Sequence, residues 1–246
     1  MEYFFTPGPL LPPGLGWPLW GKAHLGWLAG LLGLAGLLCF VYRRLEAGGR
    51  RRMRRGLALL PAAGELVVKL WLAAQGCFTP WDLPFHLCGL ALFLCLWQGF
   101  TGSRRAGAVL WCLCLPGAVG ALLFPEWHWM PLWQLQTLHH FLYHGLVVSF
   151  ILMQGLAGEI RPRLRDLRFP LLFLAGAVPL AFLCNRLLGT NFFFLALPSP
   201  GSPLEALAVW GRGSYWLLYA LLALLVMTAM ALPFEAAARR ERQEGL

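Results

Sequence analysis

The sequence predicts an all-α membrane protein, a polytopic bundle of seven transmembrane helices with the N-terminus outside and the C-terminus in the cytoplasm. Of its 246 residues, 59% are hydrophobic and 13% are charged, whereas soluble domains are about 25% charged. Sixteen of the 20 lysines and arginines lie in four clusters separated by pairs of apolar stretches: Arg43 to Arg55, Arg104 and Arg105, Arg161 to Arg168, and Arg239 to Arg242. Because basic loops stay in the cytoplasm, all four clusters are expected on that side.

The seven spans follow from length, since a helix needs about 20 apolar residues to cross a bilayer. The predicted spans are residues 23–42, 56–76, 83–100, 106–124, 132–156, 169–188 and 213–233. They make up one transmembrane domain, 23–234, between an outer interfacial segment, 1–22, and a cytoplasmic basic tail, 235–246. One long outer loop, 189–212, carries a run of Pro, Ser and Gly that excludes a continuous helix.

The charge and the cysteines exclude several other classes of protein. The formal net charge is +9, but the positive residues lie in short loops, where they set topology and meet anionic headgroups, so we expect no nucleic-acid partner. The seven cysteines show neither the spacing of a disulfide framework nor that of a metal clip. With no P-loop, βαβ unit or zinc ribbon, the sequence predicts neither a cofactor nor a bound metal.

Polar residues inside the spans are few, and in a bilayer they should face the interior of the bundle. Apart from Glu65 near mid-membrane, they lie in the outer halves of their helices, which predicts a cavity open to the outer leaflet. Glu65 and Lys69 are four residues apart, and we favour a structural ion pair between them over a catalytic role. The residues expected to line the cavity are His24, Glu65, Lys69, His86, Gln136, Arg186 and Asn191.

One stripe of the fifth span and one cysteine carry the candidate chemistry. Gln136, His140 and His144 are spaced by four and share a face, while His139 points away and pairs with Tyr143. Pro84 is expected in the first turn of span three, which places Cys88 one and a half turns inside the helix. A thiolate is a nucleophile. His86 faces another way, so the base for Cys88 must come from another helix, from His144 or His140.

An ordered series of motifs resembles the YwaF-like integral membrane proteins, the bacterial relatives of transmembrane protein 164, over residues 21 to 234. The motifs are Gly21-Lys-Ala-His24-Leu, Glu65, Leu83-Pro-Phe-His-Leu-Cys88, the segments Pro116 to Pro125 and Gln136 to His144, Thr190-Asn191-Phe-Phe-Phe-Leu, and Pro198 to Pro203. The resemblance implies an acyltransferase or acyl hydrolase acting on phospholipids and lysophospholipids. From the spans and the level of their polar residues we expect a multi-pass plasma-membrane protein with its site towards the outer leaflet.

The same resemblance implies the roles of individual residues. Cys88 attacks the acyl ester and His144 is the base, since these positions match the family's cysteine and histidine. His140 or Asn191 orients the base or stabilises the oxyanion, and Glu65 fixes a histidine tautomer. Arg186 and Lys69 attract the phosphate.

Three other functions fit the same residues. His140, His144, His86 and Glu65 could serve a metal-dependent membrane enzyme, although the HxxxH pair lacks the glutamate of a metalloprotease motif. Glu65, Lys69 and the histidines could relay protons in a transporter, although the odd number of spans and the absence of inverted repeats argue against a typical one. A non-catalytic lipid-binding protein or sensor is the third.

Overall fold

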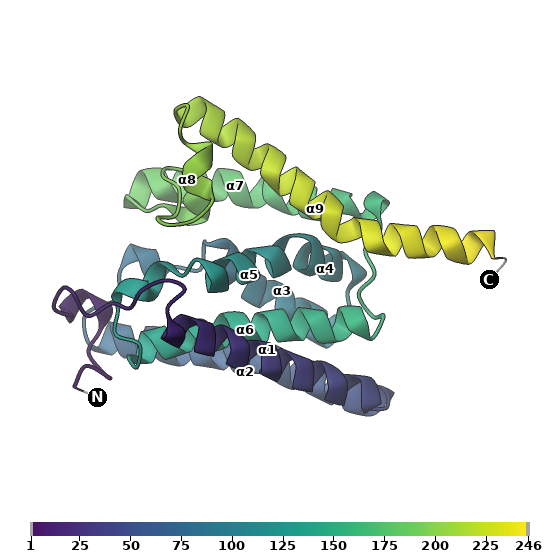
Figure 1. Ribbon diagram of the computed structural model, residues 1–246, viewed down its shortest axis with the longest axis horizontal. Coiled ribbons are helices and arrows are strands. Elements are labelled where there is room, and N and C mark those ends of the chain that lie inside the picture. The colour runs from purple at the N-terminus through teal and green to yellow at the C-terminus, as the bar shows by residue number, and fades with distance from the viewer. Residues whose placement is uncertain (1, 245–246) are drawn as a thin grey trace.

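The protein is an all-helical bundle in the computed structural model, which describes residues 2–244 (Figure 1). The first and last residues of the predicted terminal segments, 1 and 245–246, lie outside the described residues. The α-helices are α1 (Lys22–Arg44), α2 (Ala47–Ala74), α3 (Leu87–Thr101), α4 (Arg104–Val109), α5 (Leu115–Leu123), α6 (Leu135–Leu156), α7 (Arg168–Leu188), α8 (Leu204–Leu207) and α9 (Arg212–Gln243). No strand occurs in this described part of the chain.

A π-helical segment, Leu110–Cys114, joins α4 and α5 into one rod. The widened turn lies just before Pro116. A proline has no N–H to bond the carbonyl four residues earlier, and its ring clashes with that carbonyl. A π turn relieves this clash without ending the helix. The fourth predicted span is therefore a single rod with a local bulge.

Six of the seven predicted spans are confirmed as helices long and apolar enough to cross a membrane. These are Lys22–Arg44, Ala47–Ala74, Pro80–Thr101, Arg104–Trp129, Leu164–Leu188 and Arg212–Gln243. The predicted span 132–156 corresponds to α6. This helix is long enough to cross a membrane, but it is not one of the six helices that are also apolar enough. The membrane-embedded fold is thus confirmed with six apolar helices, while the seventh crossing stays a prediction.

The reason that α6 differs is its position at the centre of the bundle. It packs against α1, α2 and α5, and it has the largest set of buried residues of any helix in the described chain. A side chain added at Gly145 would meet Leu31 of α1, and one added at Gly155 would meet the Trp111 ring. A helix enclosed by other helices faces little lipid, so it can carry polar side chains at lower cost.

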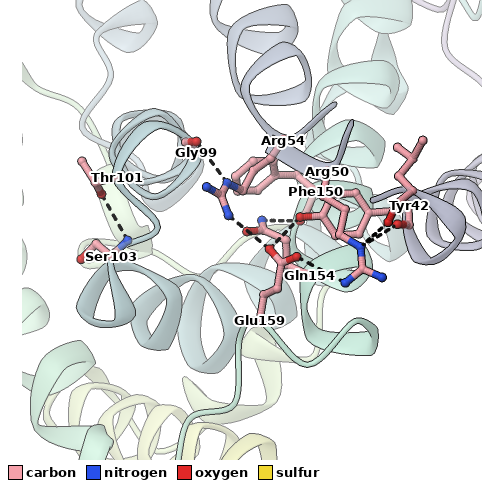
Figure 2. A network of polar contacts seen from close by, with 10 residues as sticks. Tyr42, Arg50, Arg54, Gly99, Thr101, Ser103, Phe150, Gln154 and Glu159 are labelled. Carbon is pink, nitrogen blue, oxygen red and sulfur yellow. Dashed lines mark hydrogen bonds and ion pairs between the residues drawn. The ribbon is translucent and has the colours of Figure 1, made fainter. Parts of the chain in front are cut away.

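The Glu159 carboxylate ties the ends of three helices together at the arginine-rich end (Figure 2). Glu159, just after α6, accepts a hydrogen bond from Tyr42 Oη at 2.7 Å and one from Arg54 Nη1 at 3.2 Å. Its other oxygen lies 3.8 Å from Arg50 Nη1, and Arg54 Nε donates to the Gly99 carbonyl at 3.1 Å. The ends of α1, α2 and α6 therefore meet at Glu159, and Arg54 links this junction to α3.

Ion pairs join the remaining arginine clusters to the same end. Arg104 Nη2 lies 2.8 Å from Asp166 Oδ2, and Arg161 lies 3.9 Å from Glu241 near the end of α9. The described N- and C-terminal parts lie at opposite ends of the bundle (Figure 1). We call the end that holds the four arginine clusters the basic end. All four clusters lie together, as the alternation of spans predicts.

Helices α7 and α9 form the outer part of the bundle. Within the described chain, α7 packs against α4 and α9 packs against the π-helical segment, where Trp111 Nε1 donates to the Met230 carbonyl at 3.0 Å. Most of their residues are exposed, including Leu172, Leu187 and Leu225. Large exposed apolar faces on helices of this length are typical of contact with lipid.

Candidate functional site

Cys88 lies in the first turn of α3, which corrects the predicted start of the third span. The helix begins at Leu87 after the N-cap His86, so Pro84 precedes the helix instead of lying in its first turn. Before it, Thr79 and Asp82 cap a short 3-10 turn, with Thr79 N donating to Asp82 Oδ2 at 2.7 Å. The chain then folds back, because a Cβ on Gly89 would lie only 2.7 Å from Pro84 Cα.

This position changes the chemical environment of the thiol. The N–H groups of the first helical turn have no partner within their own helix, and the N-terminal end carries partial positive charge. Cys88 is the second residue of α3, so its side chain starts beside these groups. The first turn of α3 therefore offers unpaired backbone N–H donors beside the thiol.

A triplet of ionisable side chains, Glu65, Lys69 and His139, lies between α2 and α6. Glu65 Oε1 is 2.9 Å from Lys69 Nζ, and Glu65 Oε2 is 2.7 Å from His139 Nε2. Lys69 Nζ also donates to the Asp82 carbonyl in the turn before α3. The predicted ion pair is confirmed. Because a carboxylate accepts, the His139 proton is held on Nε2. The His139 ring lies 3.6 Å from the position that a Cβ on Gly64 would take. The absence of a side chain at Gly64 therefore leaves room for this ring.

Tyr143 joins this triplet to Cys88. Its hydroxyl donates to the Cys88 carbonyl, its ring lies 5.8 Å from the His139 ring, and it meets the His144 ring edge-on at 5.0 Å. The predicted pairing of His139 with Tyr143 is confirmed. Three residues of α6 thus gather near the start of α3.

The other face of α6 packs on one tryptophan. The rings of His140 and His144 stack on Trp127 with centroid distances of 5.0 and 5.1 Å. His144 is 4% exposed, and its Nδ1 donates to the His140 carbonyl at 2.8 Å. That bond fixes the tautomer, so Nε2 of the neutral ring can accept a proton. Among the described residues, no hydrogen bond joins the Cys88 thiol to a histidine.

Three of the predicted lining residues hold parts of the chain in place. His24 is fully buried, with Nε2 donating to the Leu122 carbonyl at 2.8 Å and Nδ1 accepting from Trp20 N at 3.0 Å. Gln136 Oε1 accepts from Gly8 N at 2.7 Å. Asn191 Nδ2 donates to the Leu197 carbonyl at 2.8 Å, which closes the loop after α7. These bonds use the polar atoms that were predicted to meet substrate.

The two remaining predicted lining residues contact aromatic rings. His86 meets the Phe192 and Phe194 rings at centroid distances of 5.1 and 5.4 Å, so the loop after α7 covers the start of α3. Arg186 is exposed, with its guanidinium 5.8 Å from the Phe182 ring centroid. The structure brings Glu65 and Lys69 together near Cys88, and His140 together with His144. It records no contact of Arg186 with either group.

Sequence reasoning missed His139, Tyr143 and Trp127 as members of the site. For the first two a signal existed, because they are four residues apart and share a helix face, where Glu65 of a neighbouring span can reach them. No signal marked Trp127, which is one of 12 tryptophans and is placed by tertiary packing alone. Across residues 2–244, no three His, Cys, Asp or Glu side chains are arranged to hold a metal ion.

A family model described as the TMEM164 family matches residues 19–232 of the chain. This match covers five of the six apolar helices completely, most of α9, all of α6 and both groups of residues described above. The predicted relationship to transmembrane protein 164 is confirmed, and the narrower YwaF-like grouping stays a prediction. No curated protein and no solved structure matches the chain.

Proposed function

The chain belongs to the TMEM164 family, and from this and the surroundings of Cys88 we propose that it is a membrane enzyme acting on phospholipid acyl esters. Cys88 is the nucleophile and His144 is the base. The observation that carries the proposal is the place of Cys88 in the first turn of α3, with its backbone held by Tyr143 beside His144. We further propose that α6 crosses the plasma membrane with the other helices and that the site faces the outer leaflet.

The reaction proceeds in two halves. His144 Nε2 takes the thiol proton, and the Cys88 sulfur attacks the ester carbonyl carbon of a phospholipid. A carbon–sulfur bond forms, the ester carbon–oxygen bond breaks, and the lysophospholipid leaves with the proton from His144. The hydroxyl of a second lysophospholipid, or water, then gives its proton to His144 and attacks the thioester carbon. The carbon–sulfur bond breaks, and His144 returns the proton to the Cys88 sulfur.

The surrounding groups support this chemistry. The unpaired N–H groups of the first turn of α3 are suited to bind the oxyanion. We assign that role to the backbone because the Asn191 amide is bonded within its loop. The His140 carbonyl orients His144. Lys69 is the cation that we assign to attract a phosphate, since it bonds the turn before α3. The apolar bundle limits water, which favours transfer over hydrolysis.

The test uses purified protein in liposomes with an isotope-labelled phospholipid donor and a lysophospholipid acceptor. We expect acyl transfer by the wild type, and loss of about 100-fold or more in Cys88→Ala and His144→Ala, the usual scale for a nucleophile and its base. Cys184→Ala, which changes another partly buried cysteine, is the matched control and keeps full activity. Mass spectrometry of the quenched wild type should find the acyl group on Cys88. Full activity of Cys88→Ala would disprove the nucleophile.

A proton-coupled transporter is the second candidate, favoured by the Glu65 carboxylate that bonds both Lys69 and His139 between two helices. Buried ionisable chains of this kind serve proton relays in transporters. The same liposomes distinguish the two functions. Proton uptake that is lost in Glu65→Gln, with no acyl transfer by the wild type, would favour transport. A wild type that does neither would favour the non-catalytic lipid sensor.

A further inference from the structure

An open pocket of about 480 Å³ lies at the basic end, between the start of α4 and the start of α7. Four arginines face it, Arg104, Arg105, Arg165 and Arg168, together with one acidic and two apolar side chains. Cys88 lies at the opposite end of α3 from the Gly102 turn that leads into α4. The pocket is therefore separate from the proposed active site, and what it binds does not depend on that proposal.

The single acidic residue of the pocket, Asp166, already has hydrogen-bond and ion-pair partners. The Asp166 side chain is 3% exposed. Its Oδ2 accepts from Arg104 Nη2 at 2.8 Å and from Arg163 N at 2.9 Å. Within residues 2–244, Arg105, Arg165 and Arg168 form no ion pair. Three guanidinium groups therefore face the pocket without a neutralising partner.

Two of these arginines share one aromatic ring. The guanidinium carbons of Arg105 and Arg168 lie 5.8 and 4.8 Å from the centroid of the Phe169 ring. Cation–π attraction holds both groups near each other despite their like charge. Planar guanidinium groups fixed in this way match the oxygens of a phosphate, to which arginine donates two parallel hydrogen bonds. An anion between them also removes their mutual repulsion.

The remaining wall of the pocket is apolar and leads onto the outer face of α7. Leu172 lines the pocket and is 68% exposed, and the neighbouring Leu171 is also exposed. We propose that this pocket binds the headgroup of an anionic phospholipid, with its phosphate at Arg105 and Arg168 and an acyl chain along Leu172. A free anion would leave this apolar wall uncovered, whereas a lipid in the leaflet at the basic end covers it.

The experiment measures lipid binding to the purified full chain in detergent by native mass spectrometry, with phosphatidylglycerol and phosphatidylcholine as probes. We expect the wild type to prefer phosphatidylglycerol. The variant R105K/R168K keeps the charge and the topology signal but loses the paired hydrogen bonds, so binding should weaken about tenfold. The control R51K/R52K changes two exposed arginines at the same end, outside the pocket, and should bind as the wild type does.

Three results would overturn the proposal. If R105K/R168K bound phosphatidylglycerol as tightly as the wild type does, the pocket would not be the binding site. If R51K/R52K lost as much affinity as R105K/R168K, the lipid would be attracted to the whole basic end. Inorganic phosphate that displaces the lipid at equal concentration would show a site for the free anion. Should R105K/R168K fail to fold, Arg165→Lys tests the same pocket through an arginine that makes no ion pair in the described chain, with a smaller expected loss of about threefold.

Discussion

Glu65 is the residue on which the polar contacts between α2 and α6 depend. Its two carboxylate oxygens bond Lys69 and His139, which belong to different helices. The sequence predicted the contact between Glu65 and Lys69, because residues four apart lie on the same face of a helix. It did not predict the bond to His139, since that needs the relative rotation of two helices.

Replacing Glu65 with Gln should destabilise the protein more than removing the whole ion pair. The variant leaves the Lys69 ammonium without its partner in a partly buried position, at a cost of about 2 kcal/mol in the free energy of unfolding. Glu65→Gln combined with Lys69→Met should recover part of that loss. Chemical unfolding in detergent micelles measures both. A double variant less stable than the single one would contradict this account.

The place of Cys88 shows where residue-level prediction fails. The spacing from Pro84 suggested a helix that starts at 83, and proline is common in a first turn. The contact between Gly89 and Pro84 instead folds the chain back and delays the helix to Leu87. This contact depends on the absence of a side chain at Gly89, and helical periodicity carries no information about it.

At the scale of helices, α6 differs from the rest because its surroundings are protein. Its polar residues predicted a functional stripe, and the structure places His140 and His144 on Trp127. The same polar residues explain why α6 is not among the apolar spans. Hydropathy measures suitability for lipid contact, so it is least informative for the helix at the centre of a bundle.

The packing of α6 on α1 depends on a glycine. A Cβ at Gly145 would lie 2.5 Å from Leu31 Cδ2, so Gly145→Val should lower the free energy of unfolding by about 1–3 kcal/mol through overpacking. Adding Leu31→Ala to the same chain should restore part of this loss by making space. Thermal unfolding measured by intrinsic tryptophan fluorescence would follow both variants.

Gly36→Ala is the control for that pair, since nothing lies within 4 Å of a Cβ built at Gly36. It should unfold at or slightly above the wild-type temperature, because alanine is the better helix former. If Leu31→Ala worsened Gly145→Val by its full separate cost, the two residues would not be in contact and the packing of α1 on α6 would be wrong.

The whole molecule has one strongly basic end, and its orientation in the membrane is open to direct measurement. With the four arginine clusters in the cytoplasm, Glu244→Cys near the C-terminus should be labelled by an impermeant maleimide only after cells are permeabilised. Glu205→Cys on α8, at the other end, should be labelled in intact cells. Both positions are exposed. Labelling in the reverse pattern would show the opposite orientation.

Composition and charge alternation predicted the whole molecule better than its details. They predicted an all-helical membrane bundle and the gathering of the clusters at one end, because length, hydropathy and charge bias act on each helix separately. They did not predict Glu159 as the residue that joins α1, α2 and α3 through Tyr42, Arg50 and Arg54 (Figure 2). That junction exists only once the helices are assembled.

The way α7 and α9 attach has a consequence for biosynthesis. They pack on α4, the π-helical segment and the loops beside them, while α1, α2, α3, α5 and α6 already pack among themselves. A nascent chain that has left the ribosome as far as Glu159 can therefore pack α1 to α5 around α6, with the Glu159 junction formed. The last two long helices then dock onto a preassembled partner, so the order of translation matches the order of assembly.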